Sequence, residues 1–396
     1  MEWSDFLNPV NTFEELRKPH NRARFGNLIT IYQKEGHFPA LEGMDIAIVG
    51  VEEARAATTN KRCNHAPNAI RQYLYELFPN NPNIKIVDIG NIKKGFELPD
   101  TYAALSAVLS ELLYRKIIPV IIGGSHDLAY ANYLAYENIE KIINIVDVDS
   151  VFDIGETENE DNHRSYLSKI ILHQPNFLFN LTNIGHQSYL IDQQGLKLIR
   201  NLLFDAFRLG AVKTDMEEVE PMVRNADMVS IDISAIRMSD APGNENALPN
   251  GFYGEDVCRI ARYAGLSDKL TSFGIYEINP ELDVRGQTCH LAAQIIWYFI
   301  DGFYGRKNDF PFEGENPVVD DANYLIYTVK SDAFTEDMTF YKSKKSDRWW
   351  VEMPSSEKIK EKYRYQCFVP CSYNDYLTAC KNEVPERWLR VYEKLM

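Results

Sequence analysis

The sequence lacks the features of a membrane-spanning or secreted protein. It has no uninterrupted apolar run of about 18 residues, the length that a spanning helix needs. Its start, Met1-Glu2-Trp3-Ser4-Asp5, has neither the basic nor the apolar segment of a secretory signal peptide. We therefore expect a cytoplasmic protein with no membrane insertion.

Cysteine is also scarce. The six cysteines, Cys63, Cys258, Cys289, Cys367, Cys371 and Cys380, are too scattered for a disulfide framework. Only Cys367 and Cys371 lie close in sequence, and no matching Cys or His pair follows them. A zinc site is therefore not expected there.

The sequence also contains fewer basic than acidic residues. There are 42 Lys and Arg against 57 Asp and Glu, which gives a formal charge of -15. Phosphate backbones need clustered Lys and Arg, and no such cluster stands out, so we expect no nucleic-acid partner. Small molecules and other proteins remain as partners.

What the sequence does contain is an alternation of strand-like and helix-like segments. Strands are expected at 45–51, 84–89, 117–122, 142–146, 177–181, 228–231 and 270–278, and helices at 66–74, 102–115 and 290–304. This alternation is typical of an α/β fold, and it predicts a three-layer α/β/α domain with a mainly parallel sheet.

Composition divides the chain into three parts. Residues 1–44 form a polar N-terminal leader, residues 45–307 carry the α/β pattern, and residues 308–396 form a linker and a small C-terminal α+β appendage. The appendage is rich in Tyr and contains Trp349, Trp350 and Trp388. These aromatic residues fit either packing onto the main domain or a protein-binding surface.

Three short polar segments follow apolar strand-like runs. They are Gly123-Gly124-Ser125-His126, Asp149-Ser150-Val151-Phe152-Asp153 and Asp232-Ile233-Ser234. Ligand sites in parallel sheets form at the carboxyl ends of the strands, so these side chains should converge. Carboxylate and imidazole groups together favour a divalent metal.

In order and context, these segments resemble the motifs of the ureohydrolase family of arginases, agmatinases and formiminoglutamases. That family typically reads Gly-Gly-x-His, then Asp-Ala-His-x-Asp, then Ser-x-Asp-x-Asp followed by Ala-Pro-Gly, then Glu-x-Asn-Pro. The corresponding segments here are 123–126, 149–153, 230–234 with Ala241-Pro242-Gly243, and Glu277-Ile278-Asn279-Pro280. An early match at 66–71 extends the resemblance over roughly residues 45 to 305.

The resemblance implies an arginase-like fold and two bridged manganese ions that activate a water molecule for attack on a guanidinium or amidine carbon. Carried over position by position, the ligands of the first ion are His126, Asp149, Asp153 and Asp232. The second ion would share Asp149 and Asp232 and would need Val151 and Ser234. Valine has no lone pair and a serine hydroxyl is a weak ligand, so we expect one manganese ion or none.

Two neighbouring aspartates leave alternatives open. Starting the middle motif at Asp147 would place Asp149 at the histidine position and Val151 at the last aspartate. We prefer the register that starts at Asp149, because Phe152 and Asp153 then fit the family form. Asp127, next to His126, is another possible substitute ligand, although adjacent residues usually face opposite ways.

The resemblance also assigns catalytic roles to His163, Glu277 and the shared Asp149. His163 would move a proton or help the leaving group depart, and its alternative is an exposed loop histidine. Glu277 would pair with a planar cation of the substrate, and its alternative is a structural carboxylate that accepts backbone amides. The acidic loop 156–161 would attract a cationic amine and repel formiminoglutamate if it faced the site, and would otherwise be a solvated charge run.

Two functions follow from these expectations. One is a metal-dependent hydrolase of linear C–N bonds in a small guanidino, amidino or formimino compound. The other is a catalytically inactive relative that acts as a binding or scaffolding protein, with the appendage as a possible partner surface. Family members commonly form trimers or hexamers, so a homo-oligomer is expected, whereas the sequence does not identify the substrate.

Overall fold

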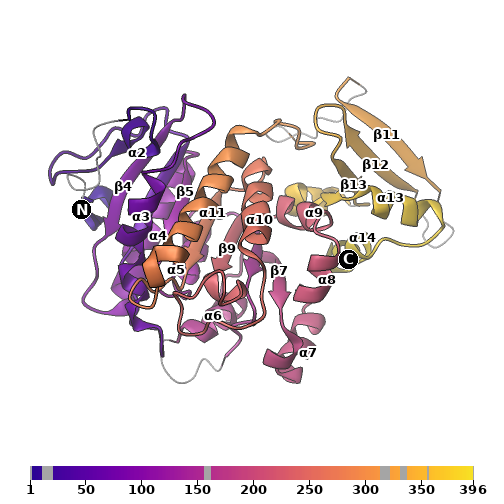
Figure 1. Cartoon of the computed structure of the whole chain (residues 1–396). Coiled ribbons are helices and arrows are strands. Elements are labelled where there is room, and N and C mark those ends of the chain that lie inside the picture. Colours follow the sequence, from indigo (N-terminus) through magenta and orange to yellow (C-terminus); the bar gives the residue numbers. More distant parts are fainter. Residues whose placement is uncertain are drawn as a thin grey trace.

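The computed structural model describes residues 2–10, 21–155, 162–312, 322–330, 337–354 and 356–395. Two bodies are visible, a large α/β domain and a smaller C-terminal unit built around its own sheet (Figure 1). Among the described residues, no helix is long and apolar enough to cross a membrane.

The large domain is built on a ten-stranded sheet with the order β1-β4-β3-β5-β10-β9-β6-β7-β8, and β2 pairs with β4. All neighbouring pairs are parallel except β1 with β4. The strands are β1 (Leu7–Asn8), β2 (Thr30–Ile31), β3 (Ile46–Val51), β4 (Ile86–Ile92), β5 (Ile118–Ile122), β6 (Ile143–Val148), β7 (Leu178–His186), β8 (Asp205–Arg208), β9 (Met228–Asp232) and β10 (Ser272–Tyr276).

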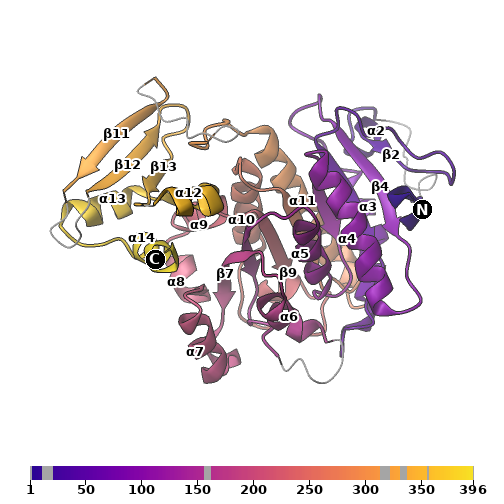
Figure 2. The ribbon, with the colours of Figure 1, turned by 180° about the vertical axis from the view of Figure 1, so that it is seen from behind.

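Helices cover both faces of this sheet. One face carries α3 (Ala66–Leu74), α8 (Leu209–Thr214), α9 (Val219–Arg224), α10 (Gly254–Leu266) and α11 (Gln287–Tyr304). The other carries α4 (Leu98–Tyr114), α5 (Leu128–Asn138), α6 (Tyr166–Leu172) and α7 (Gln193–Asn201), with α4 and α5 in front in Figure 2. Central strands such as β5 and β9 are buried along their whole length, as a sheet covered on both faces requires. The expected three-layer α/β/α fold is confirmed.

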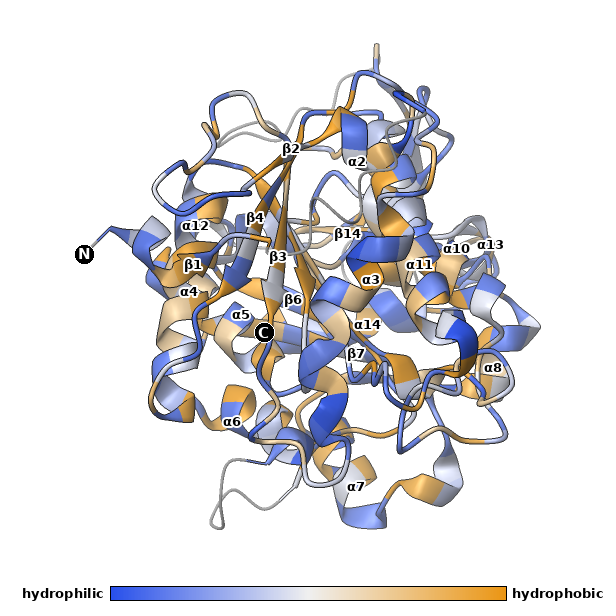
Figure 3. Cartoon of the chain, turned by 60° about the vertical axis from the view of Figure 1, so that its left-hand side comes forward, coloured by the Kyte–Doolittle hydropathy of each residue, from blue (hydrophilic) through white to orange (hydrophobic). Residues whose placement is uncertain are grey.

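The N-terminal segment joins the main sheet. β1 pairs with the end of β4, β2 pairs with its beginning, and the short helix α2 (Phe25–Leu28) packs Phe25 into the core. The apolar strands of this edge stand out against the polar loops around them in Figure 3.

The C-terminal unit is an antiparallel sheet with the order β11-β12-β13-β14 and three helices, which confirms the expected α+β appendage. Its elements are β11 (Tyr324–Val329), β12 (Met338–Ser343), β13 (Trp349–Glu352), β14 (Phe368–Cys371), α12 (Glu357–Tyr363), α13 (Tyr373–Cys380) and α14 (Glu386–Leu395). Trp349, Trp350 and Trp388 are buried in this unit. Arg224 of α9 docks it, because its guanidinium donates to the Trp349 and Cys371 carbonyls and lies over the Trp350 ring.

The strand order brings distant segments together. β5, β10, β9 and β6 are consecutive in the sheet, and their carboxyl ends lead directly to His126, Glu277, Asp232 and Asp149. Four polar segments far apart in the chain therefore meet at one edge.

Candidate metal centre

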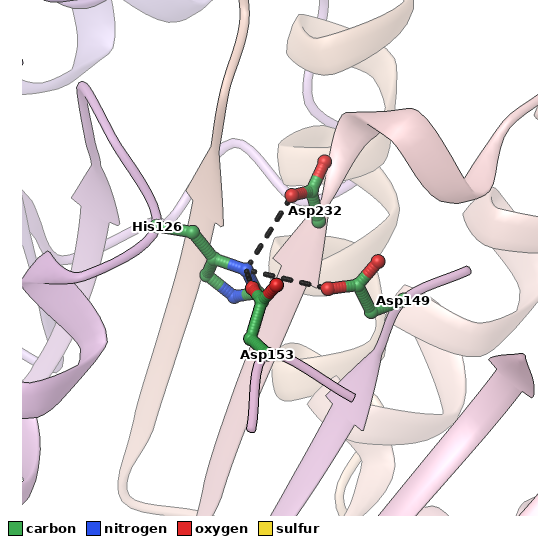
Figure 4. A group of neighbouring side chains, drawn as sticks. All are labelled: His126, Asp149, Asp153 and Asp232. Carbon is green, nitrogen blue, oxygen red and sulfur yellow. Dashed lines mark ion pairs between the residues drawn. The ribbon is translucent and has the colours of Figure 1, made fainter. Parts of the chain in front are cut away.

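Four side chains converge at this edge, and all of them are buried (Figure 4). The Nδ1 atom of His126 lies 3.6 Å from Asp149 Oδ2, 3.3 Å from Asp153 Oδ2 and 3.4 Å from Asp232 Oδ2. One ligand atom from each residue lies within 4.8 Å of every other. One nitrogen and three carboxylate oxygens thus surround a common point.

The backbone at the strand ends is shaped to hold these groups. A Cβ atom at Gly124 would lie 1.8 Å from the Glu53 carbonyl oxygen, so only glycine fits at this position, two residues before His126. Asp153 and Glu277 have φ values of 44° and 66°, a left-handed conformation that is costly for non-glycine residues. Such strain persists only where the surrounding structure imposes it, and it clusters at functional sites.

Two atoms of the cluster are unsatisfied. Within the described residues, His126 Nδ1 and Asp149 Oδ2 are buried without a hydrogen-bond partner. Buried polar atoms normally have partners, so these two call for a ligand. A divalent cation would fit, because one imidazole with three carboxylates is a donor set that manganese accepts.

The pKa values of the cluster residues also indicate that the cluster lacks positive charge. Burial, with repulsion from Asp149, raises the pKa of Asp153 to about 7. Burial and nearby Asp232 also raise the pKa of Asp149. For His126, burial opposes the charged ring, but the three carboxylates outweigh it and hold its pKa well above the ordinary value. A cation would take the place of the protons that these groups retain.

The other ring nitrogen of His126 is fixed by three groups. Nε2 lies 2.7 Å from Ser230 Oγ, 3.2 Å from Tyr166 Oη and 3.5 Å from Asp147 Oδ1. Asp147 in turn accepts hydrogen bonds from Tyr166 and Asn183. These contacts leave Nδ1 facing the three carboxylates, which is how outer groups orient a histidine ligand.

Glu277 supports the cluster through hydrogen bonds to residues in and beside it. Its Oε1 atom accepts the His126 backbone N–H at 3.0 Å, and its Oε2 atom accepts the Asn60 side-chain amide at 2.8 Å. Burial and the charge of Asp232 raise the pKa of Glu277. The carboxylate therefore holds the His126 backbone in place, while its pairing with a substrate cation stays a prediction.

His163 is not the exposed loop residue of the alternative interpretation, because only 2% of it is exposed. Its Nδ1 atom lies 3.2 Å from the Ala56 carbonyl oxygen, and its Nε2 atom is buried without a partner among the described residues. Burial lowers the pKa of His163, although Asp153 and Asp232 act in the opposite direction. A neutral imidazole with one free nitrogen thus lies within electrostatic reach of the cluster.

At the positions of the second ion, neither side chain belongs to the cluster. Val151 is half-buried and Ser234 is buried. The backbone N–H of Val151 donates to Asp149 Oδ1 at 3.2 Å, and that of Ser234 donates to Asp232 Oδ1 at 2.7 Å. The oxygens of Asp149 and Asp232 that do not face His126 Nδ1 therefore accept backbone amides.

The substitute ligands lie elsewhere. Asp147 faces Nε2 of His126 rather than the three carboxylates, while Asp153 completes the cluster, in agreement with the preferred register. Asp127 accepts a short hydrogen bond from Tyr102 and is not part of the cluster. The acidic loop 156–161 lies outside the described residues.

Sequence reasoning missed Ser230, Tyr166 and Asn60. Ser230 had a signal, because it precedes Asp232 by two residues on a strand and so shares its face. Tyr166 and Asn60 reach the site from outside the motifs, and nothing in the sequence marked them.

The sheet order and the buried cluster define an α/β protein with a His/Asp ligand set at the carboxyl edge of a parallel sheet. Residues 44–301 match the model of the arginase family, well over half of the chain, and the protein therefore belongs to this family. The resemblance inferred from the motifs is confirmed.

Individual relatives agree with this assignment. A formimidoylglutamase from Staphylococcus aureus (strain MRSA252) is 25% identical over 266 residues, which cover 64% of this chain and 85% of the relative. The crystal structure of formimidoylglutamase from Bacillus subtilis subsp. subtilis str. 168 has a TM-score of 0.65 at 17% identity, covering 75% of this chain and 98% of that one. Trypanosoma cruzi formiminoglutamase with Mn²⁺ has a TM-score of 0.62 at 18% identity, covering 68% and 100%.

Proposed function

We propose that this protein is a hydrolase of linear C–N bonds that works with one manganese ion, held by His126, Asp149, Asp153 and Asp232. The observation that carries the proposal is the buried four-residue cluster with two unsatisfied ligand atoms, His126 Nδ1 and Asp149 Oδ2. Family membership supplies the reaction class.

The chemistry divides between the ion and the protein. A bound divalent cation supplies Lewis acidity and lowers the pKa of a water molecule. The imidazole ring of His163 is neutral, and its Nε2 atom can accept a proton and return it to the departing nitrogen. Glu277 keeps His126 in position through the backbone N–H.

A formimidoyl derivative of glutamate is the first substrate to test. Several of the relatives are named formimidoylglutamases, and they match this chain over most of their own length. Guanidino compounds are the second class, because the motifs are shared across the family. The inactive alternative has no comparable observation in its favour, since the ligand cluster is complete for one ion.

The experiment combines metal analysis with a substrate panel. The purified full chain is stripped with a chelator, titrated with Mn²⁺, and assayed for formamide release from N-formimidoyl-L-glutamate and for urea release from L-arginine and agmatine. We expect one Mn²⁺ per chain and manganese-dependent turnover of one of these compounds.

Two variants complete the experiment. Asp153→Asn should abolish both binding and turnover, whereas Asp192→Asn, an exposed aspartate outside the cluster, should leave both unchanged. Two ions per chain, or none, would contradict the one-metal proposal. Stoichiometric binding without turnover of any compound would contradict the hydrolase.

A further inference from the structure

A cavity lies at the carboxyl ends of β7 and β8, on the same edge of the sheet as the metal centre. Its volume is about 640 Å³, and it is lined by the segment that follows β7, by α8, and by the loop between β9 and α10. Figure 1 shows β7, α8 and α10 on this side of the large domain. The volume falls in the range of pockets that bind small metabolites, roughly 300 to 1,000 Å³.

The charge of this cavity is opposite to that of the whole chain. Arg208, Lys213 and Arg237 line it, and in the described part of the chain no lining residue carries a carboxylate. The protein as a whole has a formal charge of -15. Three cations from three separate elements therefore face one space that no acid neutralises from within.

Two of these cations are held in fixed positions. Lys213 Nζ lies 3.5 Å and Arg237 Cζ 4.0 Å from the centroid of the Tyr253 ring. Each also has an acidic partner outside the lining: Arg237 Nε lies 2.8 Å from Asp240 Oδ1, and Lys213 Nζ lies 3.9 Å from Asp256 Oδ2. Cation–π contacts and these ion pairs restrict both side chains before any ligand arrives.

The third cation is unpaired. Arg208 ends β8 and is exposed, and it forms no ion pair with a carboxylate of the described residues. Its charge acts on His186, because burial and Arg208 together lower the pKa of that histidine to about 4. A free guanidinium in the cavity wall is a strong donor for a carboxylate or a phosphate.

His186 adds an imidazole to the cavity wall. It lines the cavity, is only 3% exposed, and has a buried Nδ1 atom without a partner among the described residues. With a pKa of about 4 the ring is neutral at neutral pH, so it adds no charge to the cavity wall.

We propose that this cavity binds a small organic acid, whose carboxylate or phosphate group is held by Arg208, Lys213 and Arg237. The site is separate from the four metal ligands, none of which lines the cavity. It does not depend on the hydrolase activity proposed above.

The test uses calorimetry on the metal-free full chain at constant ionic strength, with L-malate and inorganic phosphate as probes. L-Malate offers two carboxylates and one hydroxyl, whereas phosphate tests the other source of the anion. We expect saturable binding of at least one probe with a stoichiometry of one. The tighter probe identifies the anion class.

Arg208→Gln should weaken this binding by about tenfold or more, because a charge-assisted contact is lost. Arg200→Gln is the matched control, since Arg200 is exposed on nearby α7 and does not line the cavity. Circular dichroism checks that both variants are folded. No binding of either probe, or equal weakening in both variants, would overturn the proposal.

Discussion

At the residue scale, we propose His163 as the group that transfers a proton. It is buried, its Nδ1 atom contacts the Ala56 carbonyl oxygen, and its Nε2 atom has no partner in the described part of the chain. Its hydrogen bonds with described residues are to the backbone of Ala56 and Thr58 and not to a proposed metal ligand. Its role can therefore be separated from metal binding.

We expect His163→Asn to reduce turnover by about 10²- to 10⁴-fold, the usual contribution of a general acid or base. The Mn²⁺ dissociation constant should stay unchanged, because the ligand set is intact. Steady-state kinetics and manganese titration of the same preparation measure both. A parallel loss of metal affinity would show that His163 acts on the structure of the site instead.

Asp147 has a different role, since it faces the nitrogen of His126 opposite the cluster. We expect Asp147→Asn to weaken Mn²⁺ binding by about 10- to 100-fold, the typical effect of losing an outer carboxylate that orients a histidine ligand. Equilibrium dialysis measures the change. Asp192→Asn serves as the exposed control, and an unchanged affinity in Asp147→Asn would remove Asp147 from the support of the site.

At the element scale, we expect the segments after β6 and β9 to decide how many ions bind. Val151 and Ser234 stand where the family places two further ligands, and their backbone amides occupy the second oxygens of Asp149 and Asp232. The one-ion expectation thus depends on two side chains.

The double variant Val151→His with Ser234→Asp should raise the manganese stoichiometry from one to two per chain, because it supplies an imidazole and a carboxylate to the shared aspartates. Inductively coupled plasma analysis gives the count, and each single variant is the control. A count of one in the folded double variant would show that the loop conformation, rather than the side chains, excludes the second ion.

Elements with a strong local pattern were predictable. The helix at 66–74 has the bounds of α3, and the apolar runs before the three motifs are β5, β6 and β9. The strand β8 was missed, because Asp205-Ala206-Phe207-Arg208 at the sheet edge has neither an apolar run nor clear alternation. β1 and β2 are too short for any period, and tertiary pairing with β4 alone defines them.

For the site, spacing predicted which side chains meet but not how each is satisfied. The convergence of His126 with the three aspartates follows from strand ends in a parallel sheet. The burial of His163 and the contact between Asp127 and Tyr102 depend on helices and loops packed from elsewhere. No local pattern encodes such packing.

At the scale of the whole molecule, a bound ion would link segments of the large domain that are far apart in the sequence. Only the folded chain brings residues 126, 149, 153 and 232 together, so binding stabilises the folded state. The expected homo-oligomer and the three-part domain division stay predictions.

Addition of Mn²⁺ to the metal-free chain should raise its melting temperature. When the free Mn²⁺ concentration is about 100 times the dissociation constant, binding should add about 2.7 kcal/mol to the free energy of unfolding. Differential scanning fluorimetry measures the shift. Asp153→Asn should show none, and an equal shift in that variant would mean that the ion binds elsewhere.

This stabilisation should decline as the pH falls through about 7. Burial raises the pKa of Asp153 to about 7 and also raises that of Asp149, so below this pH protons occupy groups that must be ionised to bind the metal. The apparent affinity should drop about tenfold per pH unit for each proton displaced. Manganese titrations between about pH 5.5 and 8.5 test this pH dependence, because they extend roughly one unit or more on either side of the shifted pKa. An affinity independent of pH would contradict the assignment of these ligands.

The position of β10 in the sheet has a consequence for biosynthesis. This strand is the last of the large sheet to leave the ribosome, yet it lies between β5 and β9 at the centre of the site. A nascent chain that ends before Ser272 already contains all four ligands but lacks the strand that joins their supports. We therefore expect metal loading to follow translation and insertion of the central strand of the sheet.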